Sequence, residues 1–281
     1  MKALFDVPAP AKLNLFLHIT GRRADGYHLL QSVFMLIDWC DTLHFERRLD
    51  GRIQRHDLTT PLPADDLIVR AATLLQNATS TSLGADISID KRLPAQAGMG
   101  GGSSDAASTL LALNRLWNLQ LPLSRLEQMG LQLGADVPFF LRGRNAWVEG
   151  VGEQITPIEL PAGRFCVIKP PAGLDTARIF RHPQLERSTK PATIAVFAAD
   201  PYGFGHNDLQ PVANMLCPEV SKALELLEAH GLQARMTGSG SAVFAHCTQG
   251  NAAIQAPDHW IVRECSNLEV HPLQGWAASD N

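Results

Sequence analysis

A glycine-rich segment at residues 93–105 limits the possible folds of this chain more than any other feature. Four of the five residues from Gly98 to Gly102 are glycine, the exception being Met99. Glycine lacks a Cβ atom, so this backbone can take positive φ angles and approach an anion closely. A helical pattern starts near Ser104, and the free N–H groups at a helix N-terminus attract negative charge. The segment therefore predicts a loop that holds the phosphates of ATP.

Both serines of this segment add hydroxyl donors and are able to cap the helix. The predicted phosphate loop consists of Pro94, Gly98, Met99, Gly100, Gly101, Gly102, Ser103 and Ser104. The chain has no Gly-Lys dipeptide, which excludes a Walker A motif, and no His-Arg-Asp or Asp-Phe-Gly companion of a protein-kinase loop. The strand context of a dinucleotide-binding fold is also missing. A flexible turn is the plainer alternative, but such a turn needs only one or two glycines.

The charge balance and the cysteine usage narrow the class of protein. The 281 residues include 24 Lys and Arg against 28 Asp and Glu, a formal net charge of −4. This balance argues against binding to nucleic acid or to an acidic membrane. The five cysteines form no Cys-x-x-Cys pair and the ten histidines show no metal-ligand spacing, so we expect reduced thiols and no metal held by the protein alone. No segment resembles a leader or a membrane span, and we expect a cytoplasmic protein.

Apolar periodicity predicts a mixed α and β chain. The alternation that is typical of strands is found at residues 13–19, 33–39, 42–47, 85–91, 165–169, 242–247 and 260–264. Helical spacing favours helices from about residue 66, and over residues 104–117, 123–133 and 218–230. Glycines and prolines between residues 150 and 163 predict a domain junction, and we expect the residues after 273 to form a loose tail.

Two charged residues stand in settings that suit phosphoryl transfer. Lys12 precedes the first predicted strand, and Asp136 stands in Gly-Ala-Asp-Val-Pro, where we expect Pro138 to keep Val137 out of helical geometry. The acceptor hydroxyl needs a carboxylate to take its proton, and the moving phosphoryl group needs positive charge. A lysine beside that carboxylate would also keep it ionised. Each residue alone has a plainer interpretation, as a solvated lysine and a helix-capping aspartate.

Three segments together resemble the GHMP kinase family, which includes galactokinase and the homoserine and mevalonate kinases. They are Pro-Ala-Lys-Leu-Asn at 10–14, the loop at 94–104, and Thr-Gly-Ser-Gly-Ser at 237–241. The resemblance runs nearly end to end. Arg-Ala-Asp-Gly-Tyr-His at 23–28 and Gly-Ala-Asp-Val-Pro-Phe-Phe at 134–140 are similar to signatures of one branch, whose acceptor is a cytidine diphosphate-linked alcohol.

The resemblance implies a fold, a reaction and a setting. The fold would be two-lobed α+β, with an ATP-binding lobe similar to ribosomal protein S5 domain 2 at residues 1–158 and a ferredoxin-like lobe at 159–281. Both ligands would lie in the cleft between the lobes. The reaction would be ATP-dependent phosphorylation of a hydroxyl of the small-molecule alcohol, with Mg²⁺, in non-mevalonate isoprenoid precursor biosynthesis. We expect a monomer or a weak homodimer.

The resemblance also assigns residues to the acceptor. Asp136 would be the general base, Lys12 its charged partner, and Asn14 a neighbour of the acceptor. The cytosine would be held by Tyr27, His28 and Phe180, by aromatic stacking and by hydrogen bonds from the imidazole. This suits a pyrimidine, which has π-faces and polar edges.

Further residues are assigned by weaker matches. Asp66 and Lys91 fall where the family contacts adenine or ribose, and Gly238 and Gly240 would close over the phosphates or the acceptor. Asp66 replaces an asparagine that is common in the family, which puts an amide-type contact to adenine in doubt. Met99 replaces a leucine of similar volume, a change that should be tolerated. Asp105 is expected to stabilise its own helix as a first-turn acid rather than bind a metal.

Two other functions stay open. The chain could be another GHMP kinase, of the homoserine or mevalonate type, but Tyr27, His28 and Phe180 have a task only with a cytidine-bearing acceptor. It could also be a nucleotide-binding regulator without catalysis, which the presence of Lys12 and Asp136 opposes.

Overall fold

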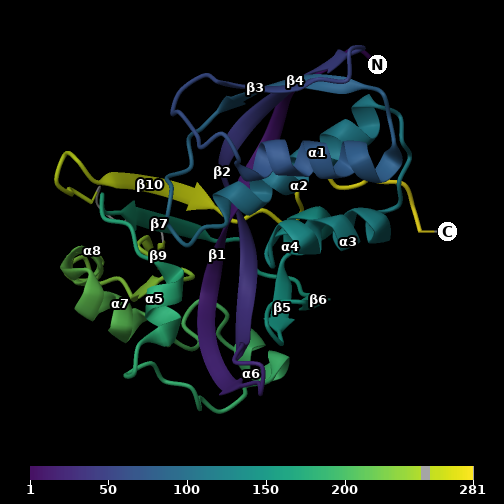
Figure 1. Cartoon of the computed structure of the whole chain (residues 1–281). Coiled ribbons are helices and arrows are strands. Elements are labelled where there is room, and N and C mark those ends of the chain that lie inside the picture. The colour runs from purple at the N-terminus through teal and green to yellow at the C-terminus, as the bar shows by residue number, and fades with distance from the viewer. Residues whose placement is uncertain (248–253, 281) are drawn as a thin grey trace.

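The structure, a computed structural model, describes residues 1–247 and 254–280, and a long antiparallel hairpin runs through it (Figure 1). The hairpin consists of β1 (Ala3–Arg22) and β2 (His28–Arg48), which are joined by the predicted turn at Gly26. β2 unites two strands that the sequence predicts separately. The polar residue between them, Asp41, is fully buried and ion-paired to Lys91, so the chain continues as a strand instead of turning.

Six strands form the first sheet, in the order β3-β4-β2-β5-β6 with β1 also paired to β2. β4 runs antiparallel to β2 and parallel to β3, whereas β5 and β6 extend the sheet from the other part of β2. The glycine-rich segment directly follows β4, so this sheet positions it. The bounds are β3 (Ile53–Asp57), β4 (Gly84–Asp90), β5 (Ala146–Glu149) and β6 (Gln154–Pro157).

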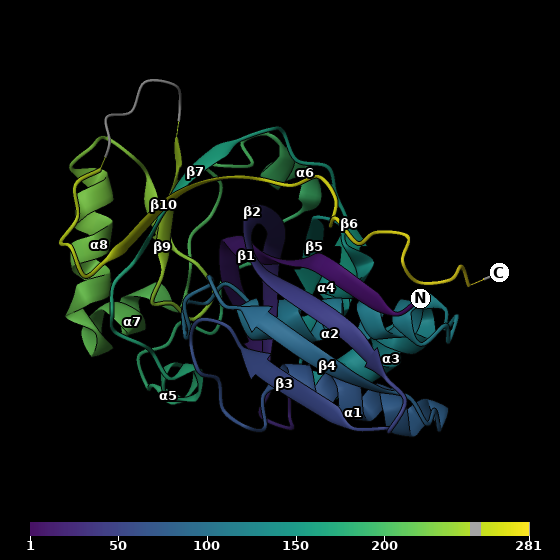
Figure 2. The same ribbon diagram turned by 90° about the horizontal axis from the view of Figure 1, so that it is seen from above.

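Four helices pack against this sheet (Figure 2). The second of them is buried along almost its whole length, which explains its many alanines and leucines. The third ends at Gly134, as the sequence predicts. The bounds are α1 (Leu67–Thr79), α2 (Gly101–Leu116), α3 (Leu123–Leu133) and α4 (Val137–Arg142). The prediction for Val137 was wrong, because α4 begins at this residue and Pro138 occupies its first turn, where a missing N–H costs nothing.

The second sheet is antiparallel, with the order β10-β7-β9-β8. Its strands are β7 (Arg164–Lys169), β8 (Ala234–Met236), β9 (Val243–Cys247) and β10 (Ile261–Ser266). The remaining helices are α5 (Thr176–Arg181), α6 (Ile194–Ala198), α7 (Gln210–Leu216) and α8 (Pro218–Glu228). Apolar side chains of α7 and α8 share one core with this sheet. The predicted α+β class is confirmed.

A separate apolar cluster joins the two sheets. It contains Phe16 and Trp147 from the first sheet, Phe165 and Phe244 from the second, and Phe197 from α6. The rings of Phe16 and Trp147 lie 5.3 Å apart, and those of Phe16 and Phe197 lie 5.9 Å apart. Aromatic contacts of this kind bury much apolar surface. The first and second sheets are therefore packed firmly against each other, which fixes the relative positions of their residues.

The prediction of a loose tail after residue 273 was wrong. Leu273 is buried, and the Arg115 guanidinium lies 4.7 Å from the ring of Trp276. Ser124 Oγ donates to Asp280 Oδ1 at 2.6 Å. The chain end thus returns from the second sheet to the helices of the first part. A domain boundary after residue 158 stays a prediction.

All five cysteines are free thiols. Within residues 1–247 and 254–280, none of the helices combines the length and the apolar character that crossing a membrane requires.

Candidate active site

The glycine-rich segment forms a left-handed entry into α2. Gly98 and Gly100 have φ angles of 72° and 71°, which glycine adopts without strain. Gly100 is the N-cap and α2 begins at Gly101, three residues earlier than the pattern predicts. Ser103 and Ser104 therefore lie in the first turn and do not cap the helix. The free N–H groups of this first turn lie at the positive end of a 16-residue helix, an arrangement that suits an anion.

The glycines are required by close packing as well as by backbone angles. A Cβ atom on Gly98 would collide with the carbonyl oxygen of Thr237. One on Gly100 would lie 2.9 Å from the ring of Phe140, and one on Gly238 would lie 2.6 Å from the carbonyl oxygen of Gly98. The two glycine loops, 140 residues apart in the chain (98 and 238), are thus pressed against each other at the backbone.

A cavity of about 930 Å³ opens in front of this loop, and we call it the loop cavity. Gly240 lines it, whereas Gly238 packs behind the loop. Of the residues predicted to bind the nucleotide, only Ser104 is not part of its wall, because its hydroxyl donates to the carbonyl oxygen of Pro10 at 2.6 Å. The others that line it are Asp66, Lys91, Pro94, Gly98, Met99, Gly100, Gly101, Gly102 and Ser103.

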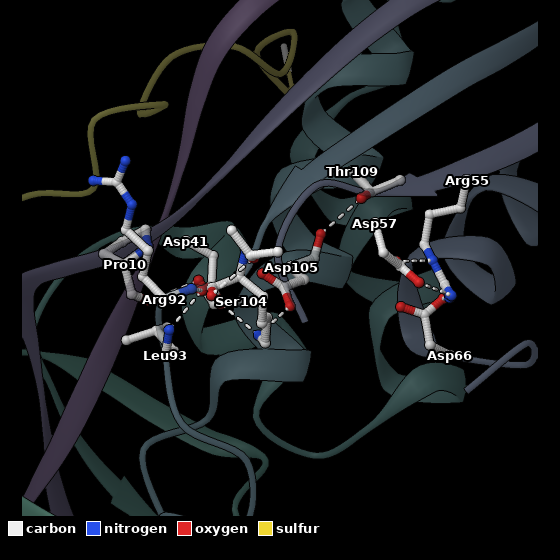
Figure 3. Close-up of polar contacts among 12 residues, drawn as sticks. Pro10, Asp41, Arg55, Asp57, Asp66, Arg92, Leu93, Ser104, Asp105 and Thr109 are labelled. Atoms are coloured by element: carbon white, nitrogen blue, oxygen red, sulfur yellow. Dashed lines mark hydrogen bonds and ion pairs between the residues drawn. The ribbon is translucent and has the colours of Figure 1, made fainter. Parts of the chain in front are cut away.

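Lys91 is the centre of a buried ion cluster with Asp41 and Asp105. Figure 3 shows these two aspartates on neighbouring elements. Its Nζ donates to Asp105 Oδ2 at 2.6 Å and also to Asp41. Burial lowers the pKa of Lys91, but the two carboxylates outweigh this effect and raise it overall. Asp105 was expected in the first turn as a helix-stabilising acid. This was wrong, because α2 starts earlier and the side chain of Asp105 is turned into the protein.

The two carboxylates of this cluster share the single positive charge of Lys91. Burial raises the pKa of Asp105 to about 8, with Lys91 opposing and Asp41 adding to the shift. The carboxylate of Asp41 has hydrogen-bond partners besides Lys91, since its Oδ1 accepts from the backbone N–H of Leu93 at 2.7 Å. Oδ1 of Asp105 is buried without a hydrogen-bond partner in the described part of the chain. The sequence did not predict Asp41 here, because a single aspartate in a strand gives no local signal of a distant lysine.

Asp66 caps α1 and is ion-paired (Figure 3). Its Oδ1 accepts from the N–H of Val69 at 3.1 Å and lies 2.8 Å from Arg55 Nη1. Arg55 also binds Asp57. The carboxylate is thereby neutralised within the protein while it lines the loop cavity, and its contact with a nucleotide stays a prediction.

Lys12 and Asp136 meet, as the sequence predicts, at an Nζ–Oδ2 distance of 3.7 Å. The lysine side chain is 5% exposed and the aspartate side chain 31% exposed, so the carboxylate can be reached from solvent and the ammonium cannot. Lys12 Nζ also donates to Asn14 and lies 4.5 Å from the ring of Phe34. Burial lowers the pKa of Lys12, and the charge of Asp136 works against that shift.

The backbone ties this pair to the glycine loop. The N–H of Lys12 donates to the carbonyl oxygen of Met99 at 3.0 Å, and a Cβ on Gly100 would lie 3.3 Å from the Lys12 side chain. Asn14 is locked from two sides, because its Nδ2 donates to Ser32 Oγ at 2.9 Å and its N–H to Thr237 Oγ1 at 2.9 Å. The pair therefore sits against the loop without lining the loop cavity itself.

A second cavity of about 650 Å³ contains Tyr27, His28 and Phe180, and we call it the aromatic cavity. Tyr27 comes from the turn before β2, His28 is the first residue of β2, and Phe180 comes from α5. The structure thus brings together the three residues predicted to hold a base. The rings of His28 and Phe180 lie 5.1 Å apart at 39°. Tyr27 is 65% exposed and leaves room for a ligand.

Three arginines that the sequence did not single out also line the aromatic cavity. They are Arg22, Arg181 and Arg187. The third of them donates from Nε to His28 Nε2 at 3.1 Å across 159 residues of sequence. No local pattern reveals a pair so far apart. The arrangement offers positive charge beside aromatic rings, which suits a phosphorylated compound with a planar ring.

The two cavities adjoin at α5, because Ala177 lines both of them. The segment that carries Asp136 passes near both of them. A Cβ on Gly134 would lie 3.7 Å from Oγ of Ser103 in the loop cavity, and one on Gly152 would lie 3.8 Å from Ala135. The ion pair of Lys12 and Asp136 is thus close to the predicted phosphate loop, on a segment that also approaches Gly152, the chain neighbour of Val151 in the aromatic cavity.

Among the residues that the structure describes, no three His, Cys, Asp or Glu side chains are placed to hold a metal ion. A divalent ion would need oxygen ligands from phosphates and water as well as from the protein.

Residues 66–144 match the GHMP kinases N terminal domain, and residues 196–265 match the GHMP kinases C terminal domain. The chain is 64% identical to the 4-diphosphocytidyl-2-C-methyl-D-erythritol kinase of Variovorax paradoxus (strain S110), over 99% of this chain and 100% of the relative. It is 65% identical to the protein of the same name from Paracidovorax citrulli (strain AAC00-1), over the whole of both chains. A crystal structure of a 4-(cytidine 5'-diphospho)-2C-methyl-D-erythritol kinase aligns with a TM-score of 0.75 and 32% identity, covering 92% of this chain and 98% of the other.

Proposed function

The chain belongs to the GHMP kinase family, and we propose that Lys12, Asp136 and the two cavities carry out its reaction. The reaction is the transfer of a phosphoryl group from ATP to the 2-hydroxyl of 4-diphosphocytidyl-2-C-methyl-D-erythritol, a step in the non-mevalonate synthesis of isoprenoid precursors.

The observation that carries this assignment is the aromatic cavity next to the loop cavity. A kinase for homoserine or mevalonate needs a phosphate loop and a base, but no site for a second aromatic ring. Here His28 and Phe180 line a cavity that shares Ala177 with the loop cavity. Arg22 and Arg181 add positive charge that suits a diphosphate. The acceptor is therefore bound by its cytidine diphosphate end, with its alcohol end directed toward Asp136.

Asp136 takes the proton of the acceptor hydroxyl as the phosphoryl group is transferred. Its partial exposure lets the hydroxyl approach, and the ammonium of Lys12 at 3.7 Å stabilises the carboxylate before transfer. Lys12 is itself held by Asn14, so its position does not depend on the substrate. Positive charge that is already in place needs no reorganisation during the reaction, which is where such a site gains its rate.

The loop cavity holds the nucleotide phosphates against the N–H groups at the start of α2. A nucleotide-binding regulator that kept the fold but lost catalysis would also have this loop. It would not need the ion pair of Lys12 and Asp136. Mg²⁺ fits the residues present only as a companion of ATP, because no three His, Cys, Asp or Glu side chains in the described part of the chain are placed to hold it. Ser103 and Asp175, which line the loop cavity, would add oxygen donors to those of the phosphates. When bound, the ion would neutralise charge on the phosphates.

From the sequence we also propose a division into two domains after residue 158, a monomer or weak homodimer, and a cytoplasmic location.

An assay with purified protein and ATP tests the assignment directly. Three acceptors are offered in parallel: the cytidylated alcohol, homoserine and mevalonate. We expect ADP release and a new phosphate ester with the cytidylated alcohol only. Phosphorylation of homoserine or mevalonate at a comparable kcat/KM would contradict the assignment. ATP binding without turnover of any acceptor would instead favour the regulator.

A further inference from the structure

Arg187 connects the two sides of the aromatic cavity through one guanidinium group. Its Nε donates to His28 Nε2 at 3.1 Å. Its Nη2 donates to the carbonyl oxygens of Phe180 at 3.1 Å and His182 at 2.8 Å, and its Nη1 to that of Leu185 at 2.9 Å. The guanidinium is a planar, rigid fork of donors. It therefore fixes the imidazole at the start of β2 relative to the C-terminal end of α5.

The bond to His28 determines where the imidazole carries its hydrogen. A guanidinium only donates, so Nε2 of His28 must present its lone pair. A neutral imidazole then has its hydrogen on Nδ1. Across residues 1–247 and 254–280, Nδ1 of His28 takes part in no hydrogen bond, and the residue lines the cavity. Its N–H is thus available to a ligand.

The surroundings of His28 favour the neutral imidazole. Burial lowers its pKa, and the positive charges of Arg187 and Arg22 lower it further. The other charged groups that line the cavity are Arg181 and Asp25. At neutral pH the ring is therefore uncharged, with one nitrogen committed to accepting and the other to donating.

We propose that Arg187 is a positioning residue that fixes His28 as an Nδ1–H donor, so that the cavity recognises a pyrimidine by an acceptor atom on its edge. The inference rests on the proposed function for the identity of the base. Cytosine presents two such acceptors, N3 and O2, beside its amino group. If His28 carried its hydrogen on Nε2, an unprotonated nitrogen would face these acceptors and repel them. Arg187 thus sets, through the imidazole of His28, which atoms of the base are recognised.

The tautomer of His28 can be measured in the ligand-free protein by ¹⁵N NMR, because protonated and unprotonated ring nitrogens have well-separated shifts. We expect the wild type to carry its hydrogen on Nδ1. Arg187→Met should shift His28 toward the Nε2–H form. Arg181→Met removes a charge from the same cavity and should leave the tautomer unchanged. An Nε2–H tautomer in the wild type, or one unaffected by Arg187→Met, would overturn the proposal. This measurement uses no substrate, so its result is independent of the proposed function.

Kinetics then separate positioning from general support of the loop. Arg187→Met should raise the KM for the cytidylated substrate about tenfold, with kcat and the KM for ATP unchanged. In a His28→Ala background the same substitution should have no further effect, because Arg187 acts through the imidazole. A further tenfold increase in that background would mean that Arg187 only supports the backbone around Leu185, and it would contradict the proposal.

Discussion

The loop cavity and the aromatic cavity are built in opposite ways. The loop cavity is shaped by backbone: the φ angles of Gly98 and Gly100 are positive, and neighbouring atoms leave no space for a Cβ on either residue. The aromatic cavity is shaped by side chains, with Tyr27 largely exposed and Arg187 bridging two distant segments. Changes in the first should therefore impair folding, whereas changes in the second should impair recognition of one ligand.

The largest effect should come from Asp136, the proposed base, which lines neither cavity. Asp136→Asn keeps the shape of the side chain but removes the base, and we expect kcat to fall about 10³-fold. The affinity for ATP should change little, because Asp136 does not line the loop cavity. Turnover measured under saturating substrates, together with ATP titration, checks this. Turnover within a factor of a few of the wild type would show that Asp136 is not the base. The two cavities would then have no assigned catalytic group.

The backbone character of the loop cavity is tested next by Gly98→Ala. The new methyl group would meet the carbonyl oxygen of Thr237, at a φ angle that alanine disfavours. We expect a loss of about 3 kcal/mol in the free energy of unfolding, measured by denaturant titration.

Gly102→Ala is the matched control. A Cβ at this position would lie 3.5 Å from Leu67 Cδ1, an ordinary contact, inside a helix where alanine is favoured over glycine. It should fold at least as well as the wild type. Equal losses in the two variants would show that the loop is sensitive to any side chain and would remove the argument from backbone geometry.

The same difference in construction explains what could be predicted from the sequence. The predicted phosphate loop is contiguous, and its residue types are dictated by backbone geometry, so residues 93–105 alone were enough to predict its left-handed entry into a helix. Lys12 and Asp136 were joined by a chemical argument, and the structure places them 3.7 Å apart. Arg187 could not be found in this way, because its partner is 159 residues distant and an arginine in a polar segment looks ordinary.

The errors in the fold have a similar cause. The start of α2 was placed too late because glycine is a poor helix former, yet Gly101 and Gly102 form its first turn, in which the N–H of Ser104 donates to the carbonyl oxygen of Gly100 at 2.9 Å. The final segment looked loose because its apolar residues are few. It is ordered by partners on distant helices, such as Arg115 against Trp276.

A smaller effect is expected in the aromatic cavity. His28→Ala should raise the KM for the cytidylated substrate about 30-fold, since it removes both a hydrogen bond and a ring beside Phe180. The KM for ATP and the free energy of unfolding should stay close to those of the wild type. Steady-state kinetics with each substrate varied in turn provide the measurement. Equal changes in both KM values would mean that the cavities are not separable, and that the aromatic cavity is as much a part of the folded framework as the loop.

The smallest expected effect concerns the charge beneath the loop. Burial raises the pKa of Asp105 to about 8, whereas an unfolded aspartate titrates near pH 4. Between these values the folded protein holds a proton that the unfolded chain releases, so this residue makes stability fall as the pH rises. An asparagine at position 105 cannot titrate. Between pH 5 and pH 9 the free energy of unfolding of Asp105→Asn should therefore rise by about 1 kcal/mol relative to that of the wild type. This is less than the pKa shift of Asp105 alone would give, because the titration of Asp105 is coupled to Lys91 and Asp41. Denaturant titrations at both pH values measure it, with the exposed Asp258→Asn as the control. A relative loss of stability at pH 9 would mean that Asp105 is ionised under the loop. The loop cavity would then owe its shape to a charged cluster as well as to its glycines.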